Sequence, residues 1–514
     1  MAQTGLSLFL DNLRSLPANL RGSVARAGSR ASDRGRSLAV FSNVFLHMHA
    51  TRVQERTLRF TTTMAMGLTA LSLFLILIVT GVLLMVYYKP SVGLAYSSIK
   101  DIHYVVPTGR FIRNIHRWAA HLMVACVIVH MARVFYTASY KAPREFNWVV
   151  GMGLLILTLA LSFTGYLLPW DQLAYWAITI GANIAASPSE LTDALGITAL
   201  FDPGGLQKEL LLGASEVGQE ALTRFYLLHV MVLPIAMLLL LCIHFWRIRK
   251  DGGLGRPGAK PTAAGKGMST PPSESAPEDA PTKTYGLMAV VRDRKEATNQ
   301  DPANTLPSWP HLMRAELVIF MATMLVCVVL GVLFDAPLKE LANPGIPENP
   351  AKAPWYFLGL QEMVSYSAFA GGLLIPVIIV LGLALIPYLD REVEDAGVYC
   401  SGPEGKRVAI QSLGFGLLMA VLSVAVPVNY GWLRAWFPDI SQLVIIFVNP
   451  GTLLTLIYAL WALRVLQSTG STRMSAIALF TCFLIGFIVL TYVATFLRGP
   501  NWGFYWSHHD WPVH

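Results

Sequence analysis

Two pairs of histidines lie on apolar stretches of this sequence. His116 and His130 are fourteen residues apart on one stretch, and His229 and His244 are fifteen apart on another. In an α-helix, with about 1.5 Å and about 100° per residue, the first pair spans roughly 21 Å, and both pairs stay within about 60° of one helix face. Two such helices side by side would bring together one histidine from each near either side of a membrane.

Neutral imidazole is a good axial ligand for haem iron, and two axial ligands close the iron to substrates, so that it transfers electrons. A single histidine in an apolar helix more often belongs to the core or to a polar network than to a metal site. Four histidines at matched spacing on two helices favour the ligand interpretation. His121 points about 140° away from His116 and is interpreted as a structural histidine.

The composition is that of a multi-span membrane protein. Hydrophobic residues make up 54% of the 514 residues and charged residues 14%, and the mean hydropathy is +0.51. The five cysteines show no C-x-x-C spacing, which indicates neither a disulfide framework nor a covalently attached haem. The net charge of +8 reflects membrane topology rather than nucleic-acid binding, because the basic residues gather on one side of the predicted spans.

Nine apolar stretches are long enough to cross a membrane. With the N-terminus on the cytoplasmic side, the segments on that side carry 25 Lys and Arg and the opposite segments carry 8. The positive-inside rule therefore predicts a cytoplasmic N-terminus and an outer C-terminus. The predicted spans are 60–87, 114–136, 148–168, 224–246, 314–335, 371–389, 408–430, 440–463 and 474–497.

The chain divides by composition into five parts. The first is a basic arm in which 36–58 is either an interfacial amphipathic helix or a plain lead-in to the first span. Two outer loops, 169–223 and 336–370, are long, apolar and rich in Trp and Pro, which is typical of loops that fold over a site. The parts are the arm (1–59), a di-haem four-helix domain (60–250), a flexible cytoplasmic linker (251–307), a second membrane domain with the second of these loops (308–400), and additional spans with an aromatic tail (401–514).

Three motifs resemble cytochrome b of the bc-type quinol–cytochrome c oxidoreductases and their photosynthetic relatives. They are the fifteen-residue histidine interval, Pro169-Trp-Asp-Gln-Leu-Ala-Tyr-Trp176, and Lys141-Ala-Pro-Arg-Glu-Phe-Asn-Trp148. They look most like the chloroplast-type form, in which the four-helix half and the following part are separate chains, whereas here the two look fused. The resemblance covers 60–250 and 308–390. It implies an all-α integral membrane protein with a di-haem four-helix bundle followed by about five further transmembrane helices.

The resemblance implies two b haems, each held by two histidines. His116 and His229 would bind the haem near the outer surface, and His130 and His244 the haem near the cytoplasm. Glycines at matching positions would leave room for the flat macrocycle, and arginines would pair with haem propionates, although snorkelling to the interface is the alternative for each arginine. The glycines are Gly67, Gly81, Gly151 and Gly165, and the arginines are Arg113, Arg133 and Arg224.

The quinol pocket of the family is implied in two loops. Pro169 and Trp170 match the first, and Trp355 and Tyr356 match the second. Many members have a glutamate before that Trp-Tyr pair, where this chain has Pro354, so the group proposed to take a proton from quinol is missing. Our hypothesis is that Glu362, seven residues beyond Trp355 on about the same helix face, replaces it. The alternative is an ordinary surface glutamate.

The chloroplast-type form attaches a third haem through a cysteine near the position of Ala65 here. Because no cysteine lies within reach of Ala65, we expect two haems and no covalent haem. The aromatic tail 502–511 is interpreted as an anchor at the outer membrane surface. A metal site at His508 and His509 is a weaker alternative, because neighbouring residues rarely ligate one ion without further partners.

The resemblance implies that quinol is oxidised at an outer site and that electrons cross the membrane through the two haems, with quinone or quinol as substrate. The expected partners are a Rieske-type iron–sulfur protein, cytochrome c or an equivalent acceptor, the membrane quinone pool and a second copy of the chain in a larger complex, with no nucleic acid. The expected location is an energy-transducing membrane, the bacterial inner membrane. Two alternatives stay open: a di-haem membrane anchor of a dehydrogenase or hydrogenase, and a histidine-dependent transporter.

Overall fold

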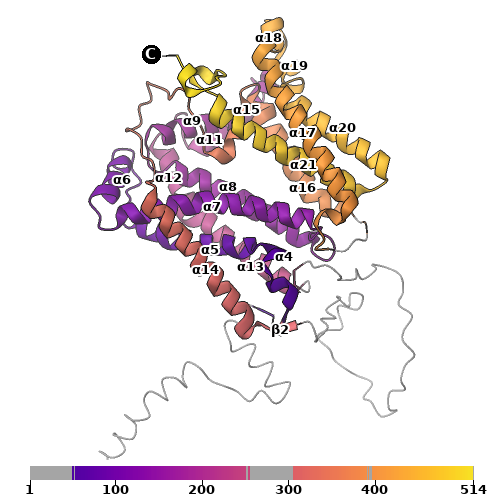
Figure 1. The fold of residues 1–514 in the computed structure, drawn as a ribbon. Helices are drawn as coiled ribbons and strands as arrows, with labels where there is room; N and C mark the ends of the chain where they lie inside the picture. Colours follow the sequence, from indigo (N-terminus) through magenta and orange to yellow (C-terminus); the bar gives the residue numbers. More distant parts are fainter. Residues whose placement is uncertain are drawn as a thin grey trace, which may run out of the picture. The chain divides into compact units, whose positions relative to one another are not determined.

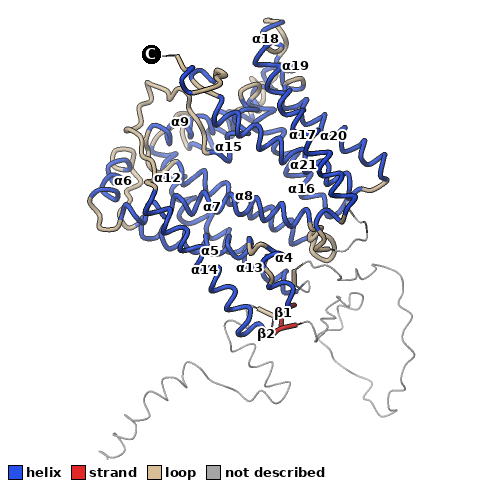
Figure 2. The backbone as a smooth tube through the Cα atoms, viewed as in Figure 1, coloured by secondary structure: helices blue, strands red, loops and turns tan. Residues whose placement is uncertain are grey.

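A computed structural model of the chain describes residues 49–50, 52–250, 253–254, 305–390, 392 and 396–512. The regular secondary structure of these residues is almost entirely helical, as predicted (Figures 1 and 2). Within them, nine helices are long and apolar enough to cross a membrane, which confirms the all-α membrane fold. They span Met66–Met85, Gly109–Tyr136, Glu145–Tyr166, Gln219–Arg249, Ser308–Leu333, Ala370–Leu389, Pro403–Trp436, Pro450–Thr469 and Thr472–Leu497.

The chain divides into two units, and the smaller one contains residues 1–58 and 300–316. Its described part is a two-stranded antiparallel sheet, β1 (Arg52–Gln54) with β2 (Thr305–Pro307). The side chain of Arg52 holds the pair by donating to the hydroxyl and carbonyl oxygens of Thr305. The part of the 36–58 segment that is described is therefore a strand and a 3-10 turn, η1 (Glu55–Leu58), and not an amphipathic helix. The basic arm and nearly all of the predicted linker lie outside the described residues.

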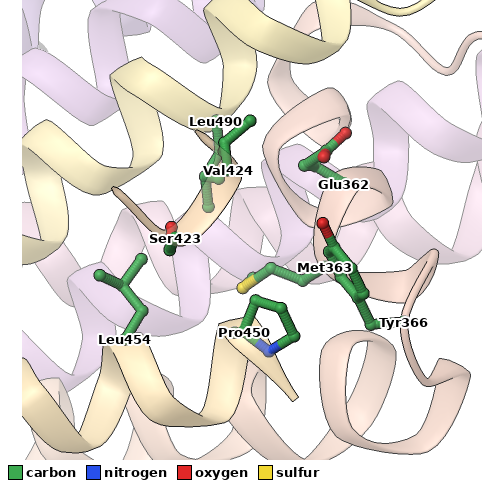
Figure 3. A pocket seen from close by; sticks show the side chains of 9 residues that line it. Glu362, Met363, Tyr366, Ser423, Val424, Pro450, Leu454 and Leu490 are labelled. Carbon is green, nitrogen blue, oxygen red and sulfur yellow. The ribbon is translucent and has the colours of Figure 1, made fainter. Parts of the chain in front are cut away.

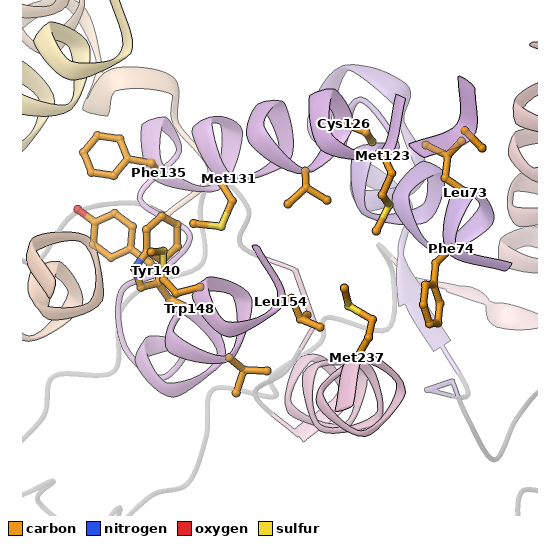
Figure 4. Close-up of a cluster of buried hydrophobic side chains, with 14 of the residues drawn as sticks. Leu73, Phe74, Met123, Cys126, Met131, Phe135, Tyr140, Trp148, Leu154 and Met237 are labelled. Atoms are coloured by element: carbon orange, nitrogen blue, oxygen red, sulfur yellow. The ribbon is translucent and has the colours of Figure 1, made fainter. Parts of the chain in front are cut away.

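Four spans of the larger unit form the bundle predicted for the histidine pairs. They are α5 (Met66–Met85), α7 (Gly109–Tyr136), α8 (Glu145–Tyr166), and a fourth helix made of α12 (Gln219–Leu227), a π-helical turn η2 (Leu228–Val232) and α13 (Leu233–Lys250). Helix α5 packs on α7, and α8 packs on α13. Apolar side chains from all four fill the core, among them Phe74, Met123, Leu154 and Met237 (Figure 4).

The two long loops predicted to lie on the outer side of the membrane, called the outer loops below, fold back and bond to each other. The first contains α9 (Gln172–Ala185), α10 (Pro188–Ala194) and α11 (Pro203–Leu212), and the second contains α15 (Trp355–Val364). Asp171 caps α9 through the backbone N–H of Ala174 and also accepts from the backbone N–H of Lys339. A further loop helix, α6 (Ala95–Tyr104), follows the first span.

Most of the remaining spans form a second group of helices. They are η4 with α16 (Ala370–Leu389), α17 (Pro403–Tyr430), α20 (Pro450–Thr469) and α21 (Thr472–Tyr492), which continues as the π-helical turn η6 (Val493–Leu497). Helix α14 (Ser308–Leu333) instead packs on α7, where Asn114 donates to the Gly331 carbonyl at 3.0 Å. The eighth span was predicted at 440–463, but the first part of this stretch forms a separate short helix, α19 (Gln442–Phe447). The membrane-spanning helix itself begins only at Pro450. Asn449 then caps a new helix by accepting from the backbone N–H of Thr452, and Pro450 occupies its first turn.

Candidate functional site

His116 and His229 face each other across the bundle. Their ring centroids are 6.3 Å apart and their planes lie at 76°. An iron atom bonded to both rings, about 2 Å from each nitrogen and with each ring centre about 1 Å behind its nitrogen, would need centroids about 6 Å apart. The spacing of these two rings therefore fits bis-histidine ligation of a haem iron.

Two threonines set the tautomer of this outer pair. The Thr80 hydroxyl donates to the Ile76 carbonyl at 2.7 Å and lies 2.9 Å from Nδ1 of His116. Because its proton is already given to the carbonyl, the hydroxyl oxygen accepts from Nδ1–H. Thr164 repeats this arrangement at 3.2 Å from Nδ1 of His229. In both rings the lone pair is thereby left on Nε2, where a metal can bind.

The inner histidines, His130 and His244, lie on the same two helices one bundle layer away. Both side chains have a buried Nδ1 atom for which the described part of the chain offers no hydrogen-bonding partner. An unpaired buried polar atom costs about 1–3 kcal/mol, so it marks a place where a further group is expected. The threonine partners of the outer pair thus have no counterpart among the described neighbours of His130 and His244.

The four glycines lie against the histidine rings. A Cβ atom at Gly81 would approach Cε1 of His116 to 3.2 Å, and one at Gly67 would approach Cε1 of His130 to 3.2 Å. A Cβ at Gly165 would collide with His229, at 2.9 Å from Nε2, whereas Gly151 leaves an ordinary 4.0 Å to His244. The glycines were predicted to make room for the macrocycle; in the structure they first make room for the imidazoles. This occurs because each stands opposite a histidine on the neighbouring helix.

The three predicted arginines have different surroundings. Arg113 is buried and donates to the carbonyls of Ala336 and Pro337 at 2.8 and 2.6 Å. Arg224 donates to the Leu210 carbonyl. Arg133 is buried, and its Nε atom has no hydrogen-bond partner among the described residues. Arg113 and Arg224 therefore already donate hydrogen bonds to loop carbonyls, while Arg133 keeps one N–H group that could donate to a further group.

A cavity of about 290 Å³ extends from the outer histidine pair to the folded-back loops. Its lining includes His116, His229, Pro169 and Tyr356. The lining is mostly apolar, as in typical binding sites for small hydrophobic molecules. Burial raises the pKa of the Tyr356 phenol, which keeps its proton at the cavity wall. The structure thus joins one histidine pair and part of the predicted quinol pocket in a single space.

Three predicted quinol-site residues are not part of the cavity lining. Trp170 is buried in a cluster of hydrophobic side chains that includes residues of the first long loop. Trp355 donates its indole N–H to Nδ1 of His121 at 3.1 Å. Glu362 is buried and lines a separate small pocket formed by α15, α17, α20 and α21 (Figure 3). It is therefore not the surface glutamate of the alternative interpretation, and its role as a proton acceptor stays a prediction.

Sequence reasoning missed two residues of the cavity, Arg117 and His121. The guanidinium of Arg117 lies over the Tyr166 ring, 5.3 Å from its centroid. A signal was available, since Arg113, Arg117 and His121 follow one another at four-residue intervals and so share one face of α7. The angle between His121 and His116 does not reveal this shared face.

Two further expectations concern the cysteines and the tail. Cys126 Sγ lies 3.1 Å from the carbonyl oxygen of Met66, the residue after Ala65. The premise that no cysteine lies within reach of Ala65 is therefore wrong in space, because α7 packs on α5. Among the described residues, no group of three or more His, Cys, Asp or Glu side chains could hold a metal ion. The tail packs on the protein, with Trp502 bonded to Glu362 and Trp511 lying 5.9 Å from the Lys352 ammonium group.

A membrane helix bundle with buried histidines that face each other is typical of haem-binding electron-transport proteins. The model of the cytochrome b/b6/petB family matches residues 55–252. Cytochrome b6 of Heliobacterium mobile is 46% identical over 186 residues, which cover 36% of this chain and 81% of that protein. Cytochrome b6 of Synechocystis sp. is 45% identical over 186 residues, which cover 36% of this chain and 78% of that protein. The chain belongs to the cytochrome b family, and haem b binding, electron transport and a membrane location follow from this membership.

The later spans are compared through a solved structure. A chain of a hyperthermophilic respiratory Complex III aligns with a TM-score of 0.56 over 91% of this chain and 97% of that one, at 22% identity. At this identity the likeness concerns the fold. It extends well beyond the 36% of the chain that the cytochrome b6 proteins cover.

Proposed function

We propose that this chain is the cytochrome b subunit of a quinol–cytochrome c oxidoreductase complex, which oxidises quinol near the outer surface and passes electrons across the membrane through two b haems. The observation that carries the proposal is the outer cavity, in which His116 and His229 face each other at 6.3 Å and whose wall also includes Tyr356. A redox centre and a pocket for a hydrophobic substrate then share one space.

The four histidines would hold the haems, His116 with His229 and His130 with His244. Haem with two axial imidazoles supplies one-electron transfer without binding substrate at iron. Thr80 and Thr164 orient the outer ligands, and the glycines allow the imidazoles to lie against the neighbouring helices. The two ligand layers are separated by about 21 Å of helix, so electron movement between them crosses most of the membrane.

Arg113, Arg133 and Arg224 are proposed to face haem propionates, and Arg117 joins them because it lines the outer cavity. Its guanidinium is in contact with an aromatic ring and has no ion-pair partner among the residues described. A cation at the edge of the haem space can therefore pair with an anionic group without first breaking a protein salt bridge.

The quinol would lie between Pro169 and Tyr356, with Trp170 and Trp355 supporting the walls. Oxidation of quinol to quinone releases two electrons and two protons. One electron would go to a Rieske-type iron–sulfur partner and on to cytochrome c or an equivalent acceptor, and the other inward through the haems. Glu362 remains the proposed acceptor for one of the protons. The chain would form a homodimer within a larger complex. This complex would lie in the bacterial inner membrane, with the N-terminus of the chain in the cytoplasm.

A redox-titrated optical spectrum with a pyridine haem assay tests this function. We expect two b haems with separated potentials and no haem that survives acid–acetone extraction. His116→Ala or His229→Ala should remove one spectral component, and His130→Ala or His244→Ala the other. A haem-free protein would favour the transporter alternative. Haem without quinol-dependent reduction would favour the dehydrogenase or hydrogenase anchor.

A further inference from the structure

His121 lines the outer cavity but belongs to neither histidine pair. It is half-buried on α7, and its ring centroid lies 6.0 Å from that of Tyr356. Trp118, three residues earlier, is the other aromatic neighbour, at 5.8 Å. The residue therefore stands at the loop end of the cavity, where the proposed quinol site lies.

The hydrogen bond from Trp355 decides which nitrogen of His121 carries the proton. Indole N–H is only a donor, so Nδ1 of His121, 3.1 Å away, must be the acceptor. A neutral imidazole that accepts at Nδ1 carries its hydrogen on Nε2. Trp355 thus makes His121 a hydrogen-bond donor at Nε2, and no described residue hydrogen-bonds to that atom.

The other charged groups of the cavity wall have contacts of their own, and Arg117 is proposed above to pair with an anionic group of the haem. Arg113 donates to two loop carbonyls, and Asp171 accepts from two backbone N–H groups. Arg117 lies over Tyr166. His121 consequently offers a directed neutral donor at the Tyr356 end of an otherwise mostly apolar cavity.

We propose that His121, held by Trp355 in the Nε2–H tautomer, donates a hydrogen bond to a ring oxygen of the quinone or quinol in the outer cavity. This inference rests on the proposed function and adds to it the residue that fixes the substrate. A quinone carbonyl is an acceptor without a donor, and it matches an N–H group that cannot accept. His121 therefore holds the oxygen, and it does not take the proton.

The test uses the haem-loaded protein in lipid nanodiscs and decylubiquinone labelled with ¹³C at its carbonyls. Binding is measured by quenching of tryptophan fluorescence, and the carbonyl stretch by infrared difference spectroscopy. We expect His121→Phe to weaken binding by about five- to tenfold, the loss of one hydrogen bond, and to shift the carbonyl band to higher frequency. His121→Gln restores an N–H donor and should recover part of both effects.

Trp355→Phe separates positioning from packing. It removes the donor to Nδ1, so His121 can adopt either tautomer, and we expect a broadened carbonyl band with weaker binding. His311→Phe, an exposed histidine on α14, is the matched control and should change neither. The haem spectrum of each variant verifies that the bundle has folded.

The outcomes distinguish this inference from the function on which it rests. If the unaltered protein binds decylubiquinone and His121→Phe leaves affinity and carbonyl band unchanged, the role of His121 is refuted and the proposed function stands. The same holds if His121→Phe and Trp355→Phe only lower the unfolding temperature. If the haem-loaded protein binds no quinone at all, the proposed function fails first.

Discussion

Glu362 of α15 and Arg498, which follows the last span, form a buried ion pair 136 residues apart in sequence. Nε of Arg498 lies 3.0 Å from one carboxylate oxygen, and the indole N–H of Trp502 donates to the same oxygen at 3.1 Å. The additional C-terminal segment is thereby bonded to the helix that begins with Trp355 and Tyr356. A carboxylate so engaged can anchor α15, and this anchoring role stands beside the proposed role as proton acceptor.

The first prediction separates these two roles. Removing one partner of a buried ion pair leaves the other charge uncompensated and costs about 3–5 kcal/mol. We therefore expect Glu362→Gln and Arg498→Gln each to lower the unfolding temperature and quinol-oxidation turnover. If Glu362 serves only to anchor α15, the double variant Glu362→Leu/Arg498→Met should recover both the unfolding temperature and the turnover.

Turnover of the double variant decides the matter, with the haem content as the control for folding. Recovered stability with turnover still lost would instead support Glu362 as the proton acceptor. Full turnover in Glu362→Gln, with both haems intact, would contradict both roles.

The second prediction concerns the contact of Gly165 with His229. A Cβ at Gly165 would lie 2.9 Å from Nε2 and 3.0 Å from Nδ1, too close unless the ring moves. Gly165→Ala should therefore displace the ligand and remove or weaken the outer haem signal. Gly382→Ala on α16 is the control, since a Cβ there would have no neighbouring heavy atom within 4 Å. Equal loss of haem in both variants would contradict the contact.

The third prediction concerns the threonine hydrogen bonds. A hydrogen bond from Nδ1–H enriches the electron density of the ligand and stabilises ferric iron. Thr80→Val and Thr164→Val should each raise the midpoint potential of the outer haem by some tens of mV, where about 59 mV is a factor of ten for one electron. Thr323→Val on α14, whose hydroxyl donates to the Ile319 carbonyl, should leave both potentials in place. Potentiometric titration measures this directly.

The fourth prediction concerns the joint between the haem bundle and the later spans. Arg473 on α21 is fully buried and donates to the Tyr140 hydroxyl and the Phe135 carbonyl, each at 2.9 Å. The Tyr140 hydroxyl donates in turn to Asp390 at 2.5 Å, and Lys141 pairs with the other carboxylate oxygen at 3.0 Å. This network joins the ends of α7 and α16 to the start of α21.

Arg473→Met would leave these acceptors without their donors. Hydrogen bonds to charged groups are worth about 1.5–3 kcal/mol each, so we expect the unfolding temperature to fall by several degrees. Arg464→Met, at an exposed arginine on α20, should be neutral. The measurement is thermal unfolding in detergent followed by tryptophan fluorescence. An unchanged midpoint for Arg473→Met would show that the network contributes nothing to stability.

The sequence determined the features that depend on local pattern. Nine apolar spans, the two histidine intervals and the loop motifs could all be recognised, because helix periodicity and span length are properties of neighbouring residues. The start of the eighth span at Pro450 was misplaced, because an apolar run hides the Asn449 cap. Local signals mark the existence of a helix more clearly than its ends.

Tertiary structure decided which side chains meet. Helical spacing placed the histidines on common faces, but only packing brought glycines against their rings, threonines to their Nδ1 atoms and Trp355 to His121. It also turned Glu362 toward Arg498 and away from the cavity. Such contacts join residues up to hundreds of positions apart, and periodicity along one helix carries no information about its partner in space.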